Sequence, residues 1–109
     1  MEVNVNQVLK DFEDKEIKDV KGNVATLRSI CIDVLMAQFD DERGLPGEEK
    51  VKRFDLALRI KYAHEQCTMT VEEVASLKKL IGKAYGPMVV GLTWKMLENA
   101  GKSYMEVIK

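Results

Sequence analysis

Apolar residues recur at helical intervals in the second half of the chain. We place one helix over residues 70–85, because its apolar positions follow one another three and four residues apart. They are Val71, Val74, Leu77, Ile81 and Tyr85. Thr70 and Glu73 have the spacing of a capping box, in which each side chain accepts a hydrogen bond from the backbone N–H of the other residue. The helix is therefore expected to begin at this threonine.

A second helix is predicted over residues 87–100, after a corner at Gly86 and Pro87. Proline suits the first turn of a helix, since its missing N–H is not needed there. The apolar residues of this helix lie most of the way around its axis, which indicates burial on more than one side or contact with a partner. They are Met88, Val89, Val90, Leu92, Trp94, Met96 and Leu97.

Two further helices are predicted earlier in the chain. The helix over residues 26–38 begins at Thr26 and has an inner face of Leu27, Ile30, Cys31, Val34 and Leu35. The helix over residues 47–65 has two apolar strips. We expect burial of the main strip, which consists of Val51, Phe54, Leu58 and Tyr62. The second strip consists of Leu56, Ile60 and Ala63.

The N-terminal segment 1–22 has a different pattern. Its valines alternate imperfectly with asparagine and glutamine, which predicts a β-hairpin with strands near residues 3–10 and 16–20 around a turn near 13–15. An alternative is a helix over residues 6–18. Because a lone hairpin is only marginally stable in water, we expect it to lie on the helices or to pair with another chain.

Together these elements predict an α+β fold, with an N-terminal β-hairpin packed on a cluster of about four α-helices. The length of 109 residues fits a single domain, 1–109, in which residues 101–109 form a tail. No internal repeat is evident. No apolar run approaches the roughly 20 residues of a membrane span. Two cysteines and the lack of a signal-peptide pattern indicate free thiols and a cytoplasmic location.

Candidate catalytic and metal-binding residues are few. His64 and Cys67 form a His-x-x-Cys pair that Cys31 could join, but a structural zinc site needs a fourth ligand. The acidic loop that begins at Asp40 has Leu45 where a calcium-binding loop requires glycine. No motif joins a nucleophile to a base, and no phosphate-binding loop is present. We therefore predict a protein that is not an enzyme and has no metal and no cofactor.

A basic strip on the helix over residues 47–65 gives the alternative function of a small nucleic-acid-binding regulator. Its contacts to phosphate would be Lys50, Arg53, Arg59 and Lys61. Against this, the net charge is only −1, and the nearby Phe54 and Tyr62 are expected to be buried and so unable to stack on bases. A run of charges on a helix is more often a solvated face.

The excess of apolar residues near the C-terminus is the feature that favours a protein interface. Methionine and aromatic residues are enriched at such contacts. The candidates are Met88, Trp94, Met96, Tyr104 and Met105. The competing interpretation is that these side chains fill the core of a small helical bundle, and for Trp94 the core is favoured.

Two stretches resemble small proteins encoded by tailed bacteriophages and prophages. They run from Leu45 to Leu58 (LPGEEKVKRFDLAL) and from Met69 to Gly91, where the sequence includes TVEEV and KKLIGKAYGPMVVG. The resemblance implies a phage context and supplies no activity and no site. It favours a non-catalytic module for protein–protein interaction, in particle assembly or host-factor binding, that self-associates or binds a protein partner.

Overall fold

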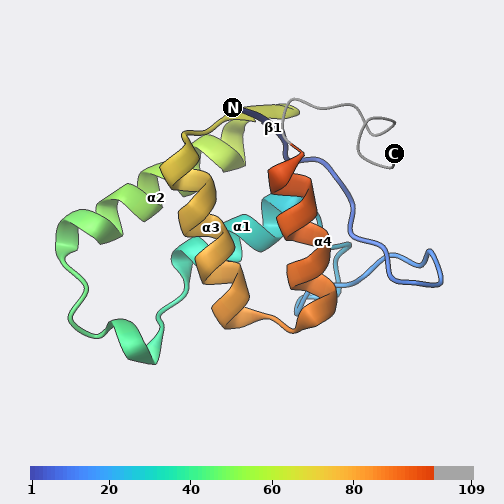
Figure 1. Ribbon diagram of the computed structural model, residues 1–109, viewed down its shortest axis with the longest axis horizontal. Helices are drawn as coiled ribbons and strands as arrows, with labels where there is room; N and C mark the ends of the chain where they lie inside the picture. Colours follow the sequence, from blue (N-terminus) through green and yellow to red (C-terminus); the bar gives the residue numbers. More distant parts are fainter. Residues whose placement is uncertain (100–109) are drawn as a thin grey trace.

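The computed structural model describes residues 1–99. Its elements are β1 (Glu2–Asn4), α1 (Leu27–Met36), the 3₁₀-helix η1 (Asp40–Glu42), α2 (Gly47–Tyr62), β2 (Gln66–Thr68), α3 (Val71–Ala84) and α4 (Pro87–Glu98). The predicted α+β class is confirmed: four α-helices pack together with a small antiparallel sheet that includes the N-terminal strand (Figure 1). The predicted tail, 101–109, lies outside the described residues.

The helix starts follow the expected local chemistry. Thr26 caps α1 by accepting from the backbone N–H of Ser29, and Thr70 caps α3 in the same way with Glu73. In both cases the residue in the third helical position bonds back to the cap, which completes a capping box. Pro87 occupies the first turn of α4, as predicted.

A single side chain from α1 closes the C-terminal end of α2. The last carbonyl groups of a helix have no partner within the helix, and a cation near them is favourable. The guanidinium of Arg28 donates to four backbone oxygens there, Ile60 O at 2.7 Å, Lys61 O at 2.9 Å, Ala63 O at 2.6 Å and His64 O at 2.7 Å. It also donates to Asn6 Oδ1 of the N-terminal segment at 2.6 Å. The helix consequently ends at Tyr62 and not at residue 65.

The sheet joins two segments that are distant in the sequence. β1 pairs with β2 in an antiparallel register that places Glu2 opposite Thr68 and Val3 opposite Cys67. Both Val3 and Cys67 are buried, so the pairing seals one edge of the core. The first predicted strand therefore finds its ladder partner between α2 and α3, and only a single bridge, between Lys10 and Glu16, closes the expected hairpin turn.

Residues 8–26 form a three-way junction in place of a regular hairpin. The junction has three isolated antiparallel bridges, one in each of its branches: Val8 with Thr26, Lys10 with Glu16, and Lys18 with Val24. Three backbone hydrogen bonds close a cycle at its centre: Ile17 N to Leu9 O at 3.0 Å, Ala25 N to Ile17 O at 2.8 Å, and Leu9 N to Ala25 O at 3.0 Å. The alternative helix over residues 6–18 is thus wrong, because these backbone groups bond across the junction.

Two arms of the junction end in the same type of turn. Asp11 accepts from two amides through its Oδ1, those of Glu13 at 2.9 Å and Lys15 at 3.0 Å. Asp19 does the same for Lys21 and Asn23, both at 2.9 Å. The residue three positions after each aspartate has a positive φ, 62° at Asp14 and 85° at Gly22. The chain therefore contains a short structural repeat, with equivalent residues eight positions apart, which corrects the expectation that it has no internal repeat.

The buried residues form one cluster in which α1 is the central helix. α1 packs against both α2 and α3, and α3 packs against α4 (Figure 1). The largest wholly buried side chains come from every part of the fold and include Leu9, Leu27, Ile60, Met69, Leu77, Ile81 and Leu97. The core therefore needs the junction and the sheet as well as the helices.

Candidate protein-interaction surface

α2 has two apolar faces, and only one of them contacts the core. The buried face consists of Leu56, Ala57 and Ile60. On the opposite side lie Val51, Phe54, Leu58 and Tyr62, which we call the outer stripe. Their exposed fractions are 58%, 51%, 38% and 72%. The prediction that this main strip is buried is wrong, because the second strip takes its place in the core.

The position of α2 explains the exposure of the outer stripe. The main packing partner of α2 is α1, and the helix lies at one edge of the molecule (Figure 1). At 3.6 residues per turn, the outer stripe falls on the side of α2 that faces away from α1. A helix with apolar residues on opposite sides is expected to be covered on both. Within residues 1–99, only one side of α2 is covered in this way.

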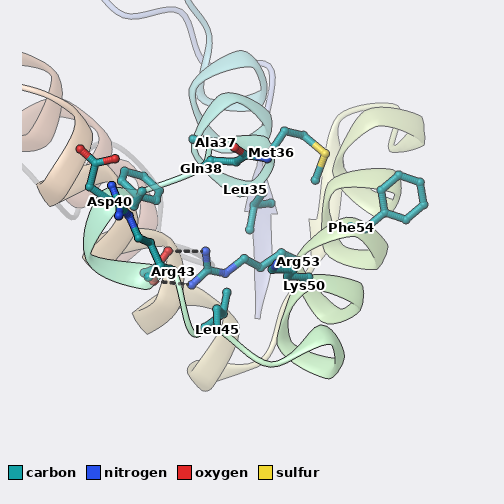
Figure 2. Close-up of a pocket in the computed structure, with 12 residues that line it drawn as sticks. Leu35, Met36, Ala37, Gln38, Asp40, Arg43, Leu45, Lys50, Arg53 and Phe54 are labelled. Atoms are coloured by element: carbon teal, nitrogen blue, oxygen red, sulfur yellow. Dashed lines mark hydrogen bonds and ion pairs between the residues drawn. The ribbon is translucent and has the colours of Figure 1, made fainter.

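A cleft opens beside the N-terminal half of α2. It has a volume of about 550 Å³ and is bounded by residues 35–40 at the end of α1, by Glu42, Arg43 and Leu45 of the following loop, and by Lys50, Arg53 and Phe54 of α2. Figure 2 shows Phe54 directed outward from α2, while Arg53 points inward across the cleft. Phe54 thus belongs to both the cleft and the outer stripe, so the two features form a continuous surface.

An ion-pair network fixes one wall of this cleft. Arg53 binds Glu42 through two hydrogen bonds of 2.8 and 2.7 Å, which Figure 2 marks as dashed lines. Lys83 of α3 lies 3.2 Å from the same carboxylate and 3.0 Å from Asp41. The hydrogen bond from Arg53 is the main cause that lowers the pKa of Glu42 from 4.5 to about 2. The network therefore anchors η1 between α2 and α3 and keeps Glu42 ionised at neutral pH.

The rim of the cleft keeps an excess of positive charge. Arg43 and Lys50 are both exposed, and neither has an ion-pair partner within the described part of the chain. Asp40 is the acidic residue of the rim, since Glu42 is already paired with Arg53 and Lys83. The surface consequently combines apolar walls with two available cations.

The predicted basic strip does not form one free surface. Arg53 is occupied by Glu42, and Arg59 pairs with Glu73 and donates to Thr68 O at 3.0 Å. Lys50 and Lys61 remain exposed, and the ammonium of Lys61 lies 5.4 Å from the ring centre of Tyr62. Two of the four predicted phosphate contacts are therefore engaged within the fold. Phe54 and Tyr62, expected to be buried, are exposed beside them.

The interface residues predicted on α4 are half-buried. Trp94 and Met96 pack against the core, and Met88 is also partly covered. The indole N–H of Trp94 donates to Lys78 O at 3.0 Å, and a Cβ added to Gly82 would lie 3.6 Å from its ring. Trp94 therefore helps to join α4 to α3. Tyr104 and Met105 lie outside the described residues.

The candidate zinc ligands are not arranged as a site. Cys31 and Cys67 are buried free thiols, whereas His64 is exposed. Burial raises the pKa of Cys31 to about 12 and also raises that of Cys67. Among residues 1–99, no group of three or more His, Cys, Asp or Glu side chains is positioned to hold a metal ion. In the same range, no helix combines the length and the apolar character that crossing a bilayer requires.

Comparison of the chain with protein-family models, with curated proteins and with solved structures yields no match.

Proposed function

We propose that this protein is a non-catalytic module that binds another polypeptide through the outer stripe of α2. The exposed stripe is the observation that carries the proposal. Helices that dock on protein partners do so through anchors spaced three and four residues apart along one face. Val51, Phe54, Leu58 and Tyr62 have this spacing and are all exposed.

The size of the exposed area supports this function. If a full Phe or Tyr side chain offers about 200 Å², the two rings of the outer stripe together expose roughly 250 Å². Val51 and Leu58 bring the stripe into the roughly 300–600 Å² range of the largest patch on an ordinary monomer, which is often functional. Polar residues flank the stripe on both sides, as expected for the rim of an interface.

The proposed partner is a second copy of this chain or another protein in the cytoplasm of a host cell. The resemblance to proteins of tailed phages supports a role in particle assembly or in binding a host factor. The half-buried Met88, Trp94 and Met96 of α4 form a second candidate contact, less exposed than the outer stripe.

The alternative function in nucleic-acid binding is favoured by one observation. Tyr62 is 72% exposed and lies beneath Lys61, a combination that can stack on a base and contact a phosphate. The paired states of Arg53 and Arg59 weigh against it. Salt separates the two functions, since phosphate binding weakens steeply with salt and an apolar contact does not.

The test is self-association measured by light scattering and sedimentation. Leu58→Glu places a charge in the middle of the outer stripe and is expected to abolish the association of the wild-type protein. Val71→Glu is the matched control, because Val71 is 68% exposed but lies at the start of α3. Loss of association in both variants, or in neither, would contradict the role of the stripe. A wild-type monomer that binds DNA at physiological salt would favour the alternative.

A further inference from the structure

Phe12 is displayed to solvent by an ordered turn. Its side chain is 95% exposed, although the backbone around it is tied by hydrogen bonds from Asp11 N to Lys15 O at 2.9 Å and from Asp14 N to Asp11 O at 3.0 Å. The Oδ1 of Asp11 holds two further amides of the same turn. An aromatic anchor on a fixed backbone loses little conformational entropy when it binds, which favours affinity.

The turn that carries Phe12 is acidic. Residues 10–16 contain four carboxylates and two lysines, of which Lys10 lies 3.9 Å from Asp14 and Lys15 lies 3.5 Å from Glu13. A partner for this turn must combine an apolar recess with positive charge at its rim. The cleft beside α2 has both, with apolar walls that include Met36, Leu45 and Phe54 and with Arg43 and Lys50 on its rim.

We infer that the cleft beside α2 receives the Phe12 turn of a second copy of this chain. This inference rests on the proposed function and names the partner. The Phe12 turn and the cleft beside α2 belong to the same polypeptide, and their charges are opposite. A second copy of the chain therefore supplies both the apolar cavity and the positive rim that the turn requires.

The geometry makes the contact head-to-tail. The Phe12 turn lies at one end of the molecule and the α2 cleft at the other (Figure 1), along a longest dimension of 41 Å. A chain therefore cannot fill its own cleft. Each bound copy still offers a free turn at one end and a free cleft at the other, and contacts of this type produce rings or open filaments.

The first experiment compares Phe12→Ser with Val20→Ser. Val20 has the equivalent place in the other arm of the junction and is 96% exposed, but residues 18–24 of that arm carry one carboxylate against two lysines. Sedimentation velocity up to about 1 mM protein is expected to show wild-type association that Phe12→Ser weakens by about tenfold or more, since buried aromatic anchors dominate interfaces. Val20→Ser is expected to associate like the wild type. A wild-type protein that stays monomeric, or a Phe12→Ser variant that associates normally, would overturn the inference.

The second experiment tests the direction of the contact by mixing. Arg43→Glu/Lys50→Glu removes the cationic rim, and both residues are exposed, so the fold should tolerate the change. This variant retains an intact Phe12 turn, and Phe12→Ser retains an intact cleft. We expect each to be monomeric alone and the mixture to form a 1:1 complex that weakens only modestly as salt increases, because exposed charges are screened while the apolar contact of Phe12 is not. Absence of the complex would refute the head-to-tail contact.

The two proposals fail differently. Leu58 is part of the outer stripe and does not line the cleft. If Leu58→Glu abolishes association and Phe12→Ser does not, the interaction module stands and the Phe12 contact is wrong. If Phe12→Ser abolishes association and Leu58→Glu has no effect, the cleft alone forms the interface and the outer stripe does not contribute.

Discussion

Replacement of Arg28 by methionine is the most informative test of how the fold is held together. Methionine retains much of the aliphatic volume of arginine and removes the guanidinium that bonds four carbonyl oxygens at the end of α2 and the side-chain oxygen of Asn6. We expect α2 to lose its C-terminal anchor while the rest of the core is unchanged. The measured effect should therefore report the helix cap together with the contact to Asn6.

The magnitude follows from the surroundings of the acceptors. The carbonyls of Ile60 and Ala63 are partly buried, and each is expected to cost about 1 kcal/mol when its charged donor is removed. The other three acceptors are exposed and can bond water. Loss of the cation at the helix C-terminus adds about 0.5–1 kcal/mol. The total is a loss of about 3 kcal/mol in the free energy of unfolding, which for a chain of this size lowers Tm by about 12 °C or more.

Urea unfolding followed by circular dichroism measures this change, with Arg28→Lys as the control. Lysine preserves the charge near the helix end but cannot span the set of acceptors, so its loss should be about half that of methionine. An Arg28→Met variant that loses less than about 1 kcal/mol would refute the reasoning, because the acceptors would then be satisfied without the guanidinium. Equal losses of unfolding free energy in both variants would show that the planar geometry of the guanidinium matters and its charge does not.

Two further predictions concern titratable groups. The pKa of Glu42 is lowered to about 2, so its pairing with Arg53 and Lys83 stabilises the fold fully above pH 4.5 and progressively less as the pH falls toward 2. The midpoint of urea unfolding should therefore fall less between pH 7 and pH 3 in Glu42→Gln than in the wild type. An equal fall in the two proteins would contradict this. Burial raises the pKa of Cys31 to about 12 and raises that of Cys67, so a disulfide reagent at pH 8 should label neither thiol before unfolding; rapid labelling of the folded protein would show that the thiols are accessible.

The helices could be predicted from the sequence because their signals are local. The helix start at Thr26, the capping box at Thr70 and the proline at the start of α4 depend on neighbours within one turn, and the structure confirms each of them. The ladder between β1 and β2 could not be predicted in this way. Each of these strands has only three residues, and more than sixty positions separate them in the sequence. Such short segments have no periodicity that could identify their partner.

The inverted orientation of α2 shows a different limit. Both of its strips are apolar at helical spacing, and periodicity alone does not tell which one faces the core. The observed orientation buries Leu56, Ala57 and Ile60 in the core and brings Arg53 to Glu42, contacts that no local pattern reveals. Residue type favours an interface on α4, which is rich in methionine and carries Trp94, whereas the structure exposes the apolar residues of the outer stripe of α2 more fully.

The Phe12 turn could not be predicted from the sequence, because the repeat that relates it to the second turn is defined by hydrogen bonds more than by residue identity. Asp11 and Asp19 are shared between the two arms, whereas the residue with positive φ is Asp14 in one and Gly22 in the other. Aspartate and glycine both tolerate that conformation, so the sequences differ although the backbones agree.

The cyclic bonding of Leu9, Ile17 and Ala25 separates the tips of the two arms from the interior of the protein. The side chains that this region contributes to the core, Leu9 and Ala25, both lie in the cycle at the centre of the junction. Each arm extends from this cycle and is closed by a single bridge, between Lys10 and Glu16 in one arm and between Lys18 and Val24 in the other. The loop sequences beyond those bridges can accordingly be exchanged or lengthened with little penalty to folding. A change of sequence or length in one arm is therefore expected to leave the backbone of the other arm unaltered.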